Sequence, residues 1–163
     1  MLIETSILVA RPVDHVWALI AEDFTGIANW FDGVVTATPI TDAPTLEGAP
    51  MAGRVCTFSA DPNGFAARER FTHFDAAAYT YSFDFEPQNA PAALPIKVNH
   101  VTVRLVEVDA DHTEVLWTAE PELKLLAKAI SPVVKAGIAK GFRGLLQDFK
   151  AAAEAPEATR RAS

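Results

Sequence analysis

Hydrophobic and polar residues alternate with the two-residue period of β-strands at the N-terminus and over most of positions 34–120. At the N-terminus one strand face would carry Ile3, Thr5, Ile7 and Val9, and β-branched residues of this kind favour strands. Six further strands are expected at 34–41, 53–60, 66–74, 79–86, 96–108 and 112–120. Short turn sequences separate several of them, which predicts an antiparallel sheet.

The helical period of about 3.6 residues occurs in two parts of the chain. Two short helices should follow the first strand, and their apolar positions are Val13, Val16, Trp17 and Ile20, then Ile27, Trp30 and Phe31. From 122 to 154 the sequence favours a long helix, in which Ser131-Pro132 marks a kink or a second start. The expected fold class is therefore α+β, with seven antiparallel strands and one long C-terminal helix packed on a sheet face.

The apolar stripe of the long helix contains two glycines. It consists of Ile130, Val134, Gly137, Gly141, Leu145 and Phe149. A glycine inside a helix costs about 0.8–1.0 kcal/mol relative to alanine, so these positions need a reason. Either the sheet backbone packs closely on a smooth helix, or the missing side chains leave a hollow. The aromatic and partly polar inner face of the sheet favours a hollow that binds a ligand.

Length and charge narrow the classes of function. The 163 residues predict a single domain over 1–154 with a flexible polar tail over 155–163. The net charge is −7 and the basic residues look scattered, which disfavours nucleic acid and an anionic membrane surface as partners. No apolar run approaches a membrane span, so no membrane insertion is expected. The acidic residue at position 4 is unlike a secretory signal, which predicts a cytoplasmic location.

Motifs for metal or cofactor chemistry are missing from the sequence. The histidines are His15, His73, His100 and His112, and their spacing matches no local metal signature. The lone Cys56 excludes a cysteine metal cluster. Neither a serine-nucleophile motif nor a phosphate-binding loop is present. We therefore expect no metal and no other cofactor.

An ordered series of short motifs resembles a known superfamily. The series runs through Ala10-Arg11-Pro12, Val16 to Ile20, Trp30 to Val35, Gly53-Arg54-Val55, Arg68 to Phe71, Leu94-Pro95-Ile96, Thr102 to Leu105 and Thr113 to Trp117. It resembles the START-like (helix-grip, SRPBCC) superfamily, and within it the polyketide cyclase/dehydrase and lipid-transport-like family. The resemblance covers about residues 2–154. It implies a START-like ligand-binding domain, in which a curved sheet wraps around the C-terminal helix and encloses a cavity.

Strand alternation and this resemblance together propose the site residues. The Arg-Glu-Arg pattern of the family implies that Glu69 faces the cavity, and alternation puts His73 on the same face. For strand 96–108, apolar alternation favours Asn99 inward, whereas a one-residue bulge would turn His100 inward. The catalytic candidates are Glu69, His73 and Asn99. The predicted ligand-binding residues are Phe31, Glu69, Phe71, Tyr79, Tyr81, Phe83, Asn99, Val101, Trp117, Val134, Gly137, Gly141 and Leu145.

Three functions are compatible with these features. The first is binding or carriage of a small, mainly hydrophobic molecule by a monomer or homodimer. The second is a polyketide cyclase or aromatase that acts in the same cavity, with one or two acid/base groups. A carboxyl group desolvated by aromatic rings could supply such a group. The third is an interaction protein whose interior is filled.

Overall fold

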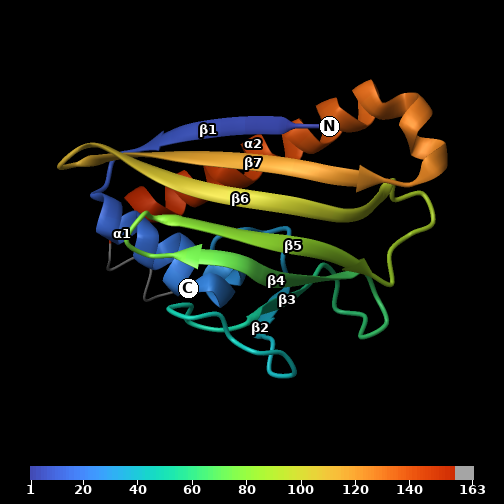
Figure 1. Cartoon of the computed structure of the whole chain (residues 1–163), viewed down its shortest axis with the longest axis horizontal. Helices are drawn as coiled ribbons and strands as arrows, with labels where there is room; N and C mark the ends of the chain where they lie inside the picture. Colours follow the sequence, from blue (N-terminus) through green and yellow to red (C-terminus); the bar gives the residue numbers. More distant parts are fainter. Residues whose placement is uncertain (157–163) are drawn as a thin grey trace.

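Seven strands form one antiparallel sheet in the computed structural model, which describes residues 1–156 without the side chain of Leu126 (Figure 1). The strands are β1 (Ile3–Val9), β2 (Thr36–Pro39), β3 (Gly53–Thr57), β4 (Ala66–Asp75), β5 (Thr80–Gln88), β6 (Ile96–Asp109) and β7 (His112–Leu123). Their order in the sheet is β1-β7-β6-β5-β4-β3-β2. The expected seven-stranded antiparallel sheet is confirmed. The predicted tail at 155–163 lies outside the described residues from position 157 onward.

Two short helical segments follow β1, as expected. The first is α1 (Val13–Trp17), which continues into a π-helical turn, η1 (Ala18–Glu22), and the second is the 3-10 helix η2 (Phe24–Asn29). Pro12 occupies the N-cap of α1, where its lack of an N–H group costs nothing. Buried Val16, Trp17 and Phe24 join the main hydrophobic core, so these helices close one end of the sheet.

The long helix begins later than the sequence predicts. Glu122 and Leu123 still pair with β6, so the chain remains a strand at the predicted helix start. A 3-10 helix, η3 (Leu125–Ile130), connects β7 to α2 (Ser131–Glu154). Pro132 lies in the first turn of α2, where proline is tolerated but cannot continue a helix from upstream. Ser131-Pro132 is therefore the true start of the helix.

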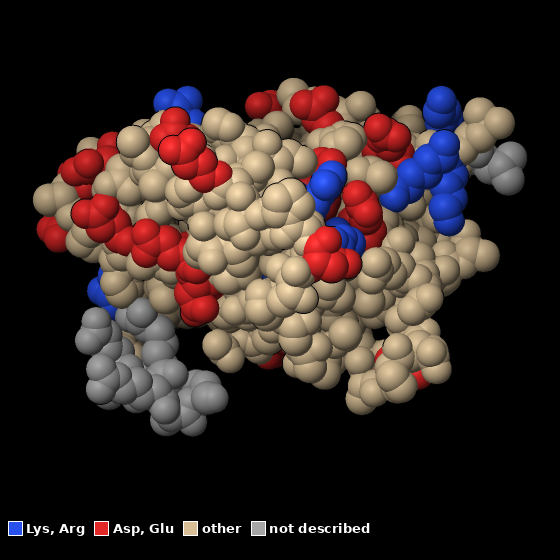
Figure 2. All heavy atoms as spheres, turned by 60° about the horizontal axis from the view of Figure 1, so that its bottom comes forward, with Lys and Arg blue, Asp and Glu red and all other residues tan. Residues whose placement is uncertain are grey.

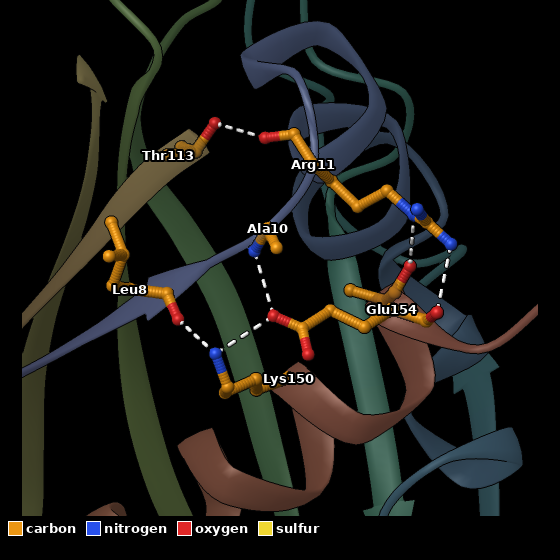
Figure 3. A network of polar contacts seen from close by, with 7 residues as sticks. Leu8, Ala10, Arg11, Thr113, Lys150 and Glu154 are labelled. Atoms are coloured by element: carbon orange, nitrogen blue, oxygen red, sulfur yellow. Dashed lines mark hydrogen bonds and ion pairs between the residues drawn. The ribbon is translucent and has the colours of Figure 1, made fainter. Parts of the chain in front are cut away.

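Polar contacts fasten the C-terminal end of α2 to the end of β1 (Figure 3). Arg11 donates from Nε to the carbonyl oxygen of Ala153 at 2.9 Å and from Nη2 to that of Glu154 at 2.8 Å. The Glu154 carboxylate accepts from the backbone N–H of Ala10 at 2.7 Å and from Lys150 Nζ at 2.8 Å. These contacts occupy carbonyl groups that a helix terminus leaves without intrahelical partners.

The other end of α2 lies beyond the sheet, and the helix passes behind β1 and β7 in the view of Figure 1. Leu146, Phe149 and Ala153 are its most buried residues, and they pack against the core that β1, β6 and β7 also line. Within the described residues, no helix has both the length and the hydrophobicity needed to cross a membrane.

Candidate functional site

A cavity of about 260 Å³ lies between α2 and the sheet. Its walls come from η2, from strands β3 to β7 and from the middle of α2, together with residues of two loops. The lining residues are Ile27, Phe31, Val34, Arg54, Phe58, Glu69, Phe83, Phe85, Ile96, Asn99, Val101, Trp117, Ile138, Gly141, Phe142 and Leu145. The wall is thus almost wholly apolar, and its charged and amide side chains are confined to Arg54, Glu69 and Asn99.

Arg54 and Glu69 form a buried ion pair in the cavity wall. Arg54 Nε donates to Glu69 Oε2 at 2.6 Å, and the two side chains are only 5% and 8% exposed. The guanidinium also donates to the carbonyl oxygen of Phe24, and its Cζ atom lies 3.8 Å from the centroid of the Phe24 ring. Glu69 is therefore one half of a buried ion pair rather than a lone carboxyl group among aromatic rings.

The backbone of β3 brings the two charges together. Arg54 and Glu69 are directly opposite each other in the β3–β4 pairing. The residue before Arg54 is Gly53, with φ at 151°, and a Cβ atom there would lie 2.1 Å from the backbone oxygen of Glu69. Only glycine permits this approach of the two strands. Gly53 thus sets the position from which Arg54 reaches Glu69.

Burial and the ion pair shift the pKa values of neighbouring groups. Burial is the largest single effect on Arg54 and lowers its pKa, but the charge and hydrogen bond of Glu69 together with neighbouring Cys56 and Tyr81 outweigh it, so the net pKa lies above the ordinary arginine value. Desolvation raises the pKa of the buried Cys56 thiol to about 12. It also raises the pKa of buried Tyr81, whose hydroxyl donates to the carbonyl oxygen of Ile20 at 3.2 Å. Both groups keep their protons at neutral pH.

Two polar atoms of cavity residues are buried without a hydrogen-bond partner among the described residues. They are Oδ1 of Asn99 and Nε1 of Trp117. Buried polar atoms are nearly always hydrogen-bonded, because an unmade bond costs about 1–3 kcal/mol. An acceptor and a donor left unpaired in one apolar cavity are suited to a ligand that carries a polar group.

Most of the predicted ligand-binding residues line the cavity. These are Phe31, Glu69, Phe83, Asn99, Val101, Trp117, Gly141 and Leu145. In β6 the register shifts between Ile96 and Val98, so Lys97 is exposed, and from Val98 onward the regular alternation points Asn99 inward. Asn99 is buried and His100 is exposed, so of the two registers left open the first is the one observed.

The catalytic candidate His73 lies on the opposite side of the sheet from the cavity. The β4–β5 register shifts between Phe71 and His73, which marks a β-bulge. One extra residue reverses the alternation beyond it, so Phe74 turns toward the core and contacts Trp17, with ring centroids 5.3 Å apart. Exposed His73 therefore cannot join Glu69 in the cavity. The prediction that His73 is a catalytic residue of this cavity is therefore wrong.

Five other predicted ligand-binding residues do not line the cavity. Phe71, Tyr81 and Val134 are buried elsewhere in the molecule. The Tyr79 hydroxyl donates to Asp14 of α1, which raises the pKa of Tyr79. Gly137 is exposed on α2. These residues share strand faces or a helix stripe with cavity residues, but the cavity occupies only part of the interior.

Sequence reasoning missed several wall residues. Ile138 and Phe142 follow Val134 at four-residue spacing, and Phe85 continues the inward alternation of β5, so a signal for these three was present. Phe58 lines the cavity from the end of β3 and stacks on Phe65 of the following loop, with ring centroids 4.7 Å apart. No periodic signal marks Arg54, which is placed by the approach of β3 to β4.

The glycines of α2 do not mediate close packing. A Cβ atom added at Gly137 or at Gly141 would meet no atom within 4 Å beyond the neighbouring helix backbone. Gly141 lines the cavity, whereas Gly137 does not. The hollow interpretation therefore applies to Gly141 alone.

The chemistry available in the wall is limited. Arg54 and Glu69 are the titratable residues among the lining side chains. In the part of the chain that the structure describes, no group of three or more His, Cys, Asp or Glu residues is placed to hold a metal ion. The arrangement can bind and orient a molecule, and it can stabilise charge through the guanidinium of Arg54.

Comparison with known families gives a match over nearly the whole chain. The model of the family described as polyketide cyclase / dehydrase and lipid transport matches residues 2–154. No curated protein matches the sequence.

Solved structures share the fold at low sequence identity. A START superfamily protein from Mycobacterium smegmatis is 10% identical with a TM-score of 0.75, covering 94% of this chain and 97% of that chain. The Zhui aromatase/cyclase from Streptomyces is 16% identical with a TM-score of 0.70, covering 94% and 93%. Norcoclaurine synthase from Thalictrum flavum, solved with dopamine and hydroxybenzaldehyde, is 16% identical with a TM-score of 0.64, covering 92% and 83%. These similarities confirm the expected helix-grip fold.

Proposed function

The chain belongs to the polyketide cyclase / dehydrase and lipid transport family, and we propose that it binds a small, mainly hydrophobic molecule in the cavity between α2 and the sheet. The observation that carries this proposal is the apolar cavity of about 260 Å³ with two unpaired polar atoms in its wall. A cavity of about 150 Å³ already accommodates benzene. The volume here therefore suits a molecule of one or two rings better than a long lipid chain.

The polar atoms indicate what the ligand carries. Asn99 Oδ1 accepts a hydrogen bond and Trp117 Nε1 donates one. In the β6–β7 pairing Asn99 lies opposite Pro121, four residues along β7 from Trp117, so the two atoms mark two separate polar positions. A hydroxyl group can donate to Asn99 Oδ1 or accept from Trp117 Nε1. We therefore expect an aromatic or alicyclic alcohol or phenol, with its hydroxyl near Asn99 and its rings against residues such as Phe83 and Phe142.

Displacement of a fluorescent apolar probe, N-phenylnaphthylamine, tests this proposal. The probe should bind the protein, and bicyclic phenols should displace it more strongly than the matching hydrocarbons. Asn99→Leu should weaken the binding of phenols about tenfold, because about 1–1.5 kcal/mol of hydrogen bonding is lost. Binding of the probe itself should stay unchanged. Asp84→Asn, on the outer face of β5, serves as a control. If the folded protein binds no probe, or if phenols and hydrocarbons compete equally, the proposal is wrong.

A second candidate function is catalysis on a polyketide-like chain, and the Arg54–Glu69 pair in the wall is what favours it. A guanidinium held in an apolar cavity could stabilise an enolate formed during ring closure. Asn99 could orient the same carbonyl group, whereas His73 cannot take part from the outer face. A gene adjacent to a polyketide synthase would favour this function, and retention of an unmodified molecule in native mass spectrometry of protein from its own host would favour binding. An interior filled by side chains, the third hypothesis, is not supported by a cavity of this volume.

A further inference from the structure

The basic residues of this acidic chain are concentrated in one segment. Between Leu123 and Gln147 the sequence contains five of the 14 Lys and Arg residues and none of the 21 Asp and Glu residues. They are Lys124, Lys128, Lys135, Lys140 and Arg143. The basic residues are thus less scattered than the overall composition suggests. The segment that contains them corresponds to η3 and the first half of α2.

These five cations point to an external anionic partner. Lys128, Lys135, Lys140 and Arg143 are exposed, and Lys124 is partly so. None of the five forms an ion pair within residues 1–156. By contrast, Arg54, Arg68 and Lys150 are each paired with a carboxylate. In Figure 2 Lys and Arg atoms gather at the right-hand end of the molecule, where Figure 1 places the connection between β7 and α2.

Large aliphatic side chains stand exposed among the same cations. Leu125 is 76% exposed, Val133 is 72% exposed and Ile130 is 55% exposed. All three lie in η3 or in the first turn of α2. Single exposed hydrophobic residues are ordinary, but three within nine positions at a projecting turn mark an interaction surface.

A depression beside this turn adds a third feature. It has a volume of about 480 Å³, and Lys97, Lys128, Ser131 and Met1 contribute to its wall. The wall also includes Glu122, whose carboxylate is engaged by His100 Nε2 at 3.2 Å. Two ammonium groups and a hydroxyl form a polar recess suited to an anionic headgroup.

We propose that this end of the molecule docks on the surface of an anionic lipid bilayer. The docking surface consists of Lys97, Lys124, Leu125, Lys128, Ile130, Val133, Lys135 and Lys140. Exposed aliphatic side chains enter the headgroup region, and the surrounding lysines bind the anionic surface. The docking surface is richer in lysine than in arginine, whereas protein interfaces are depleted in lysine and enriched in arginine and aromatic residues. A bilayer is therefore favoured over an acidic protein as the partner.

Docking here would place the bilayer close to the cavity. Val133 of the docking surface and Gly141 of the cavity wall are eight residues apart in α2, about 12 Å along the helix axis. The opposite end of α2 is the one fastened by Arg11. A hydrophobic ligand could then pass between bilayer and cavity with little exposure to water. This consequence rests on the proposed function, whereas docking itself does not.

Co-sedimentation with vesicles tests the docking. The full chain should bind vesicles of phosphatidylcholine with about one third phosphatidylglycerol at least tenfold more tightly than pure phosphatidylcholine vesicles, and salt should weaken the binding. Each lysine near such a surface changes the partition coefficient about fivefold. Lys128→Glu with Lys140→Glu should therefore weaken binding at least about 25-fold, and Leu125→Asp with Val133→Asp should also weaken it strongly.

Matched variants on other surfaces distinguish the loss of the docking surface from the effect of a change in the protein's net charge. Arg70→Glu with Arg104→Glu makes the same charge change on the outer sheet face, and Val108→Asp replaces an exposed aliphatic residue near the end of β6. These controls should retain at least half of the vesicle affinity. Absence of vesicle binding, or equal loss in the controls, would overturn the proposal and leave an acidic protein as the partner. N-phenylnaphthylamine binding, measured without vesicles, reports separately on the cavity.

Discussion

Arg54 and Glu69 lie opposite each other on β3 and β4, with Nε and Oε2 2.6 Å apart in the wall of an apolar cavity. The approach depends on Gly53, and the guanidinium is held further by the Phe24 carbonyl and ring. Burial of two charges is costly, and their mutual attraction repays this cost only while both are present. The pair thus links the shape of the cavity to the stability of the fold.

Glu69→Gln should lower the free energy of unfolding by about 3–5 kcal/mol at neutral pH, because it leaves the Arg54 charge buried without its counterion. A lone carboxyl among aromatic rings would give the opposite result, with equal or higher stability. Urea denaturation followed by circular dichroism measures the difference. Exposed Glu120→Gln on β7 is the control and should change the stability by less than about 0.5 kcal/mol.

The double variant Arg54→Met with Glu69→Leu gives a further check. It removes both charges and keeps apolar volume, so most of the stability lost in Glu69→Gln should return. The Phe24 carbonyl oxygen loses its donor, which leaves a deficit of about 1–3 kcal/mol. A Glu69→Gln protein as stable as the wild type would contradict the importance of the ion pair.

Gly141→Leu should abolish binding of N-phenylnaphthylamine, whereas Gly137→Leu should not. Both positions have free space for a Cβ atom, but only Gly141 lines the cavity. Neither variant should unfold the protein, and replacement of each glycine by alanine should raise the free energy of unfolding by about 0.8–1.0 kcal/mol. Fluorescence titration and urea denaturation of the four variants measure both effects. Equal probe binding by Gly141→Leu and Gly137→Leu would show that the probe binds elsewhere.

The sequence predicts the fold well because periodicity reports burial. Alternation over 34–120 and the helical period after Ser131 each follow from one face meeting the core. The predicted start of the long helix at residue 122 was wrong. Residues 122–130 have good helical propensity, but Glu122 and Leu123 pair with β6 and extend the strand instead. Tertiary pairing overrode local preference there.

The candidate site is less accessible from sequence, for two physical reasons. A bulge inverts the alternation of a strand without leaving a periodic signal in the sequence, so His73 was wrongly expected on the cavity side. A buried ion pair depends on which strands become neighbours, so Glu69 could be assigned to the cavity while its partner Arg54 could not. Asn99 was placed correctly because the bulge at Lys97 precedes it and does not alter the alternation that follows.

His100 should make the stability depend on pH. Its Nδ1 atom lies 2.6 Å from Asp84 Oδ1 and its Nε2 atom lies 3.2 Å from Glu122 Oε1. These hydrogen bonds raise the pKa of His100 above its unfolded value near 6.5. Because the folded state binds this proton more tightly, His100 stabilises the fold fully below about pH 6.5 and loses that contribution as pH rises through the folded pKa.

His100→Gln should therefore reduce the free energy of unfolding more at about pH 5.5 than at about pH 9. Urea denaturation at both pH values measures this difference between wild type and variant. His73→Gln replaces another exposed histidine of the same sheet and serves as the matched control. A His100→Gln effect that is constant over this range would mean that the contacts with Asp84 and Glu122 do not favour the charged imidazole.

Arg11→Ala should loosen the C-terminal turn of α2 while the cavity stays intact. Arg11 donates two hydrogen bonds to the terminal carbonyls of Ala153 and Glu154, and hydrogen bonds from a charged donor contribute about 1.5–3 kcal/mol each. Hydrogen exchange should accelerate at the amides of 150–155, and probe binding should remain close to that of the wild type. Arg11→Lys should restore the protection only in part, because an ammonium group cannot reproduce the two-pronged geometry of the guanidinium. Faster exchange over all of α2 would instead mean that this contact holds the whole helix on the sheet, including the wall around Gly141.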